Sequence, residues 1–368
     1  MKENGSAKCR VETLNETCPT NDGYCTRVFY RLPEAVDYVE IRAKREPLRL
    51  THYAQLTAAE GYVFAPFTLS EQNPFWLIPA DEKIRHKVEV PVTQSPKAER
   101  CERDTEIKSY ARAFAQCKEM LSDGHLEKIV LSRTATLRMC TPLTVAHRHA
   151  LFLESCHRYP HSFVSLVELP APYGAWLMAT PEVLVETEIN GFHTMALAGT
   201  SPVSDESKLL LENWSPKNRR EQACVADYIG KHLTALSTEV HESAVYVRRA
   251  ASLLHLCTDF HLTSSGETTL ASLAAVLHPT PAVCGTPVEE ARRVIAQVES
   301  HDRVYYSGFS GPVSQDEAHL YVNLRCAHLF PTHATLYAGG GLLHESDFDA
   351  EWRETERKLT TMADLFRA

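Results

Sequence analysis

Several features that define common classes of protein are missing from this 368-residue sequence. No apolar run reaches membrane-spanning length, and the polar opening, MKENGSAKCRVETLNETC, has no apolar block of signal-peptide length. We therefore expect a cytoplasmic protein with no membrane partner. The sequence also has no Lys- or Arg-rich run, and its formal net charge is −9, so nucleic acid is a poor candidate partner.

Ready-made metal and disulfide motifs are also absent. The eleven cysteines are scattered without a CxxC pair, and none of the 18 histidines belongs to an HExxH motif. We expect reduced and mostly buried thiols, as is usual for cysteines in a reducing compartment. An anionic small molecule remains compatible with the acidic balance, because a local cluster of Arg, Lys or metal dominates at short range.

What the sequence does contain is typical of a globular protein, with 44% hydrophobic and 23% charged residues. A polar stretch, VPVTQSPKAERCERDTE, closes a first part of about residues 1–100 that is hard to divide further. Residues 101–368 alternate helical patterns, such as 105–122, with strand-like segments, such as LEKIVLSRTATL and THATLYAGGGLL. This irregular mixture favours large, antiparallel sheets over a regular βαβ repeat.

Two predicted helices place charges on the stripe that should face the core. In SPKNRREQACVADYIGKHLTAL, with Ser215 as N-cap and Pro216 at the first helical position, Glu221 heads an apolar stripe. In DAEWRETERKLTTM, Glu351, Glu354 and Lys358 lie three and four residues apart. These carboxylates could reach solvent or form ion pairs at the rim of the core. A divalent cation between the helices would also compensate them, and Mg²⁺ prefers such oxygen ligands.

Short motifs along the chain carry a family resemblance. EKIVLSR, ATPEVLVE, ALAGTSP, SPKNRREQACVADYI, LHPTPAVCGTP, DRVYYSG, NLRCAHL, LYAGGGL and AEWRETERKLTTM occur in the order seen in chorismate-utilising enzymes, the group that includes anthranilate synthase component I. The sequence most resembles the isochorismate synthases among them. The resemblance implies an α+β fold in which two antiparallel sheets stack with helices around them. It covers 101–368 as the chorismate-binding catalytic region, with 1–100 a weakly similar part of the same fold.

The resemblance implies an enzyme that converts chorismate to isochorismate, by adding water at C2 while the C4 hydroxyl leaves. Lys128 would be the base and Glu182 the acid. From the residues alone, Lys128 could equally be a solvated lysine at a strand end, and Glu182 a turn residue after Pro181. As a base, Lys128 needs a pKa well below its reference value of about 10.4, whereas Glu182 must hold a proton near neutrality.

The remaining site residues follow from the resemblance in the same way. Mg²⁺ would be the cofactor, held by Glu221 and Glu354, with Glu351 bound directly or through water. The residues expected to contact substrate are Gly199, Thr200, His278, Tyr306, Arg325, Gly339, Gly341 and Lys358. Arg325 suits a carboxylate because guanidinium binds it in bidentate fashion, although a structural ion pair would also explain it. Tyr305 rivals Tyr306, and His278 could instead be a packed core histidine.

Details of the motifs indicate which enzymes within the family the sequence resembles most. HPTPAVCGTP resembles isochorismate synthases, and Ala198 stands where aminodeoxychorismate synthases often have a nucleophilic Lys. No glutaminase subunit is expected. A salicylate synthase, which would go on to eliminate pyruvate, and a non-catalytic chorismate-binding protein remain as alternatives. Asn218 and Gln222 depart from the acidic residue and His often found around the metal-binding Glu. The pathway served, menaquinone or siderophore, stays open.

Overall fold

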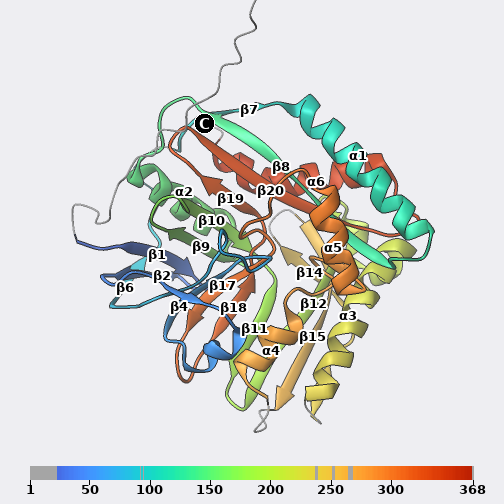
Figure 1. Cartoon of the computed structure of the whole chain (residues 1–368), viewed down its shortest axis with the longest axis horizontal. Helices are drawn as coiled ribbons and strands as arrows, with labels where there is room; N and C mark the ends of the chain where they lie inside the picture. Colours follow the sequence, from blue (N-terminus) through green and yellow to red (C-terminus); the bar gives the residue numbers. More distant parts are fainter. Residues whose placement is uncertain are drawn as a thin grey trace, which may run out of the picture.

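Two stacked antiparallel sheets form the framework of the protein in the computed structural model (Figure 1). The structure describes residues 23–91, 93, 95–236, 239–250, 253–263 and 268–366. Each sheet has ten strands, and helices pack on the outer faces. This is the α+β architecture that the sequence predicts.

The first sheet carries the glycine-rich motif and Lys128 near one edge. Its strands run in the order β16 (Gly285–Thr286), β8 (Lys128–Met139), β20 (His333–Leu342), β19 (Cys326–Leu329), β10 (Ala175–Thr180), β9 (Phe163–Glu168), β1 (Thr26–Arg31), β2 (Asp37–Ala43) and β6 (Glu82–Lys87), while β7 (Ala98–Cys101) also pairs with β8. In the pairing of β8 with β20, Gly341 lies opposite Val130 and Gly339 opposite Ser132. The start of β8 is thereby placed beside the AGGG segment.

The second sheet brings together strands from the two halves of the chain. Its order is β13 (Val240–Glu242), β15 (Leu253–Thr263), β12 (Gly191–Pro202), β11 (Val183–Glu188), β18 (His319–Val322), β17 (Phe309–Val313), β4 (Gly61–Ala65), β5 (Phe75–Ile78) and β3 (Leu48–Leu50), and β14 (Tyr246–Ala250) also pairs with β15. Strands from the described part of residues 1–100 therefore belong to both sheets.

The core between the sheets is strongly aromatic. Trp176 of the first sheet packs against Phe64 of the second and is fully buried, and the rings of Phe163 and Tyr321 stack at 4.3 Å between centroids. Such pairs stabilise a core beyond their apolar area alone. They hold the two sheets, and hence the residues at their edges, in a fixed relation.

Helices cover both outer faces of the sandwich. They are α1 (Arg103–Ser122), α2 (Val145–Arg158), α3 (Pro216–Leu236), α4 (Leu270–Leu277), α5 (Val288–Val298) and α6 (Phe348–Ala363), with short 3₁₀ turns η1 (Tyr53–Ala58), η2 (Glu206–Leu209), η3 (Leu211–Asn213) and η4 (Asp364–Phe366). The predicted N-terminus of α3 is confirmed, because the Asn218 N–H donates to Ser215 Oγ at 3.2 Å. Asp347 caps α6 in the same way, accepting from the Ala350 N–H at 3.0 Å.

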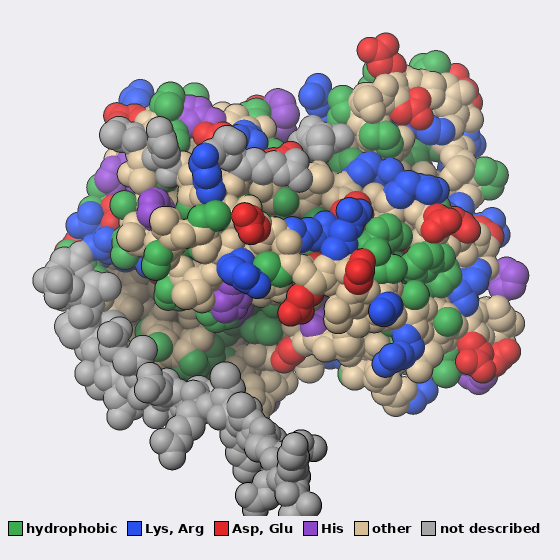
Figure 2. Space-filling view, turned by 90° about the horizontal axis from the view of Figure 1, so that it is seen from above, with side chains coloured by type: hydrophobic (Ala, Val, Ile, Leu, Met, Phe, Trp, Pro, Cys, Tyr) green, Lys and Arg blue, Asp and Glu red, His purple; other side chains and the backbone are tan. Residues whose placement is uncertain are grey.

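One face of the protein carries charges of both signs. On the face shown in Figure 2, Lys and Arg side chains alternate with Asp and Glu. Within the described ranges no helix has both the length and the apolarity needed to cross a membrane. Nine cysteines in these ranges are free thiols, whereas Cys9, Cys18 and the polar opening of the chain lie outside them.

Candidate active site

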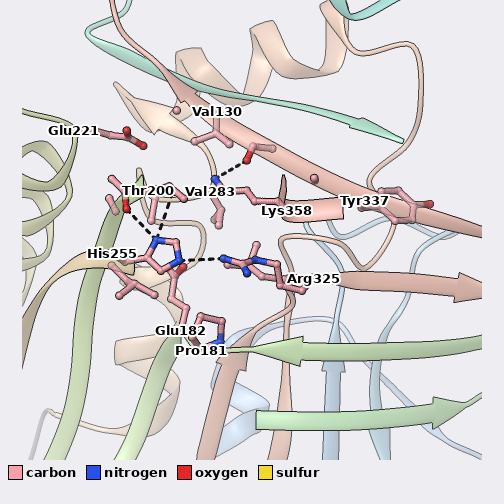
Figure 3. Close-up of a pocket in the computed structure, with 18 of the residues that line it drawn as sticks. Val130, Pro181, Glu182, Thr200, Glu221, His255, Val283, Arg325, Tyr337 and Lys358 are labelled. Atoms are coloured by element: carbon pink, nitrogen blue, oxygen red, sulfur yellow. Dashed lines mark hydrogen bonds between the residues drawn. The ribbon is translucent and has the colours of Figure 1, made fainter. Parts of the chain in front are cut away.

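A small cavity lies between the edges of the two sheets, where α3 and α6 approach them (Figure 3). Its volume is about 60 Å³, enough for a few water molecules. Nine of the predicted site residues line it: Glu182, Gly199, Thr200, Glu221, Tyr306, Arg325, Gly339, Gly341 and Lys358. Segments far apart in the sequence therefore meet at one place.

Lys128 is fully buried directly behind this lining, at the first position of β8. Its ammonium donates to the Pro281 carbonyl at 2.8 Å and lies 3.7 Å from Glu221 Oε1. Burial lowers the pKa of Lys128, although the nearby Glu221 carboxylate partly opposes this. Lys128 is thus not a solvated strand end, and its pKa moves in the direction that a general base requires.

Glu182 lines the opposite side of the cavity from Glu221 (Figure 3). It follows Pro181 in the turn between β10 and β11 and is buried. Burial raises the pKa of Glu182 to about 8, against the attraction of Lys128 and Lys358. A carboxyl group with this pKa holds a proton at neutral pH, as a general acid must.

Arg325 projects into the cavity from the turn before β19, in a left-handed backbone conformation with φ of 48°. Its guanidinium donates to His255 Nε2 at 3.1 Å, and His255 Nδ1 lies 2.9 Å from the Gly199 carbonyl. Because guanidinium has no acceptor, His255 must carry its proton on Nδ1 and donate it to Gly199. Burial and Arg325 lower the pKa of His255 to about 3, so the ring stays neutral and orients Arg325.

The structure decides which of Tyr305 and Tyr306 lines the cavity and whether His278 does, which the sequence leaves open. Tyr306 lines the cavity, whereas the Tyr305 hydroxyl accepts from Trp76 Nε1 and donates to the Pro74 carbonyl away from it. The predicted contact of His278 with the substrate cavity does not appear. Its ring packs on Phe309 and bonds to the Tyr53 hydroxyl at 3.0 Å and the Ser307 carbonyl at 3.1 Å. This is the packed core histidine of the alternative interpretation.

Three buried carboxylates approach one another beside the glycine-rich strand. A Cβ atom added to Gly341 would lie 2.1 Å from Glu221 Oε1, and one added to Gly340 would lie 3.1 Å from Glu351 Oε2 and 3.7 Å from Glu354 Oε1. The missing side chains of β20 therefore make room for acidic side chains from both α3 and α6. The spacing in each helix predicts that these charges face inward, and in the structure the two sets meet here.

Two lysines from the same helices, together with the buried Lys128, balance the charge of these carboxylates. Lys217 Nζ lies 2.6 Å from Glu351 Oε1 and 3.9 Å from Glu221 Oε2, and Lys358 Nζ lies 2.7 Å from Glu354 Oε1. Burial raises the pKa of Glu354, but the attraction of Lys358 and Lys217 outweighs it and leaves that pKa low. Burial and the neighbouring Glu354 carboxylate raise the pKa of Glu351 to about 7.

The residues at this place fit a hard divalent cation in chemistry. All three side chains offer carboxylate oxygens, and the buried Glu351 Oε2 has no hydrogen-bond partner. The three carboxylates do not yet have the geometry of a metal site. Among the described residues, no three His, Cys, Asp or Glu side chains are close enough together to coordinate one ion. The Lys217 ammonium instead bridges Glu351 and Glu221.

The two residues that depart from the family pattern, Asn218 and Gln222, both contact the second sheet. The Gln222 side-chain amide donates to Thr258 Oγ1 of β15 at 2.8 Å. Asn218 packs against Gly199, where an added Cβ would come within 3.2 Å of the Asn218 carbonyl oxygen and where φ is +73°. Both residues thus fasten α3 to the second sheet.

Sequence reasoning missed two residues of the site. The segment LLHLC could have indicated His255 as a site residue, because a polar residue interrupts an otherwise apolar strand there. Helical spacing could have indicated Lys217, because it lies one turn before Glu221 on the same face of the helix.

Comparison with known proteins identifies the class. The sequence model described as chorismate binding enzyme matches residues 71–367, and the chain belongs to this family. It is 33% identical over 273 residues to isochorismate synthase DhbC of Bacillus subtilis, covering 70% of this chain and 67% of that protein. It is 30% identical over 265 residues to isochorismate synthase EntC of Escherichia coli strain K12, with the same two coverages.

A solved structure agrees on the fold. The menaquinone-specific isochorismate synthase MenF of Escherichia coli superimposes with a TM-score of 0.78 at 21% sequence identity, covering 94% of this chain and 89% of MenF. The family resemblance predicted from the sequence motifs is confirmed.

Proposed function

We propose that this protein is an isochorismate synthase, which converts chorismate to isochorismate with Mg²⁺ as cofactor. The observation that carries the proposal is the pair Lys128 and Glu182, both buried, with Glu182 in the cavity lining and Lys128 directly behind it, the amine pKa lowered and the carboxyl pKa raised. The curated relatives DhbC and EntC, which bear this activity in their names, support it.

Lys128 would act on the water that attacks ring carbon C2. A neutral amine can keep donating to the Pro281 carbonyl while its lone pair takes a proton from the water. On the other side of the ring, Glu182 would donate its proton to the C4 hydroxyl, which leaves as water while the double bonds shift. One water enters and one leaves, so the product is an isomer of the substrate.

The two carboxylates of chorismate would bind at separate positions. Arg325, held by His255, and the Tyr306 hydroxyl would take the enolpyruvyl carboxylate. The ring carboxylate would lie near Gly339, Gly341 and Lys358. Bound Mg²⁺ would neutralise the negative charge of this group, and Glu221, Glu351 and Glu354 are the residues that would hold it.

Product analysis tests the proposal. Purified protein with chorismate and Mg²⁺, without ammonia, should give isochorismate by chromatography, and EDTA should stop the conversion. Salicylate formed together with an equal amount of pyruvate would instead establish the salicylate synthase alternative. Binding of chorismate without any turnover would establish the non-catalytic alternative. The name of the menaquinone-specific relative MenF favours menaquinone biosynthesis as the pathway, with siderophore biosynthesis as the alternative.

A further inference from the structure

Lys217 is the side chain whose position the proposed reaction does not explain. Its ammonium lies 2.6 Å from Glu351 Oε1 and 3.9 Å from Glu221 Oε2, so it joins α3 to α6 through two of the three carboxylates. Unlike Lys358, Lys217 is not one of the residues that line the cavity. We infer that Lys217 is an internal competitor for Mg²⁺, occupying the cation position between Glu221 and Glu351 until the ion displaces it.

The charges at the site explain why a cation must be there at all. Three buried carboxylates that face one another repel strongly unless positive charge lies among them. Lys128 lies beside Glu221 and Lys358 beside Glu354, and the Lys217 ammonium supplies the positive charge at Glu351. It draws Glu351 towards α3, with the Ser346 hydroxyl donating to the same Glu351 oxygen at 2.8 Å. Glu351 Oε2 is left without a partner in this arrangement.

The ammonium and the ion cannot share the position. Mg²⁺ binds carboxylate oxygen at about 2.0–2.1 Å. An ion held by Glu221, Glu354 and Glu351 would therefore lie within a few ångströms of Lys217 Nζ, which contacts two of these carboxylates, and the two positive charges would repel. The side chain of Lys217 is 20% exposed, so its head can turn towards solvent as the ion enters. Removing this competing charge should tighten Mg²⁺ binding.

The inference rests on the proposed Mg²⁺ site, and the experiment separates the two. Mg²⁺ alone is titrated by calorimetry into the whole protein without chorismate. Lys217→Gln should bind Mg²⁺ about ten- to a hundredfold more tightly than the unmodified protein, because the repulsion between two positive charges a few ångströms apart is removed. Lys217→Arg, which retains the charge, should not bind it more tightly. Lys231→Gln removes an exposed lysine from the same helix and should leave the affinity unchanged.

An equal or weaker Mg²⁺ affinity in Lys217→Gln would overturn the inference, because the lysine would then support the metal site or play no part in it. Absence of Mg²⁺ binding in every variant would reject the proposed metal requirement itself. Thermal unfolding gives a second measurement that needs no activity. Without metal, Lys217→Gln should melt below the unmodified protein, and saturating Mg²⁺ should raise its melting temperature by more. A smaller rise than in the unmodified protein would also contradict the inference.

Discussion

Gly341→Ala should damage catalysis while leaving the fold intact. The added Cβ would lie 2.1 Å from Glu221 Oε1 and 3.0 Å from Lys128 Cε. Contacts of a real Cβ are essentially never shorter than 3.0 Å, so the Glu221 carboxylate must move by about 0.9 Å. A shift of about 1 Å in a positioned group can cost on the order of a hundredfold in rate. We therefore expect chorismate turnover to fall about a hundredfold, together with weaker Mg²⁺ binding.

Folding should tolerate the same change. The φ angle of Gly341 is not in the left-handed region, and the displaced atom ends a flexible side chain, so overpacking should cost only about 1–3 kcal/mol. Gly230→Ala is the matched control within α3, where the nearest atom to an added Cβ is Phe260 Cε1 at 3.5 Å. It should stay active and gain up to about 1 kcal/mol, since Ala favours a helix over Gly.

A double-mutant cycle identifies the cause of the loss. In a Glu221→Ala background no carboxylate remains to be displaced, so Gly341→Ala should change the residual turnover by less than about threefold. Wild-type turnover and Mg²⁺ affinity in Gly341→Ala would refute the reasoning. So would a full hundredfold loss in both backgrounds, because the effect would not then act through Glu221.

Two further predictions concern the acid and the base. Lys128→Met should reduce turnover by about 10²- to 10⁴-fold, the usual contribution of a general base, with the Kd for chorismate in calorimetry nearly unchanged; an active variant would remove Lys128 from that role. The raised pKa of Glu182, about 8, means that it is protonated below this pH and loses its proton above it. The pH profile of kcat/KM should accordingly decline above about pH 8, and a profile that stays flat to pH 10 would contradict the assignment of Glu182 as acid.

Residues on helices were the most predictable part of the site. Helical spacing alone places Glu221 on the apolar stripe of α3 and Glu351 and Glu354 on the inner face of α6, and the structure buries all three. Their meeting beside β20 depends on two sheets closing around them, which no local pattern encodes. The family resemblance supplied that link before the structure did.

Residues in turns and strands depended on tertiary contacts. Burial sets the pKa of Glu182, yet its local sequence reads only as a turn after Pro181. His278 shows the reverse case, since the ring turns towards Tyr53 and Ser307 in the core rather than towards the cavity. Its neighbourhood is formed by segments more than 25 residues away, so its direction could not be read from LHPTP.

The most direct test of the central claim uses water labelled with ¹⁸O. If the base side of the cavity delivers water to C2 while Glu182 expels the C4 hydroxyl, isochorismate formed in labelled solvent must gain one ¹⁸O atom, seen as a mass increase of two units. Isochorismate without the label would contradict the account, because the hydroxyl would then have migrated without the water that Lys128 is proposed to activate.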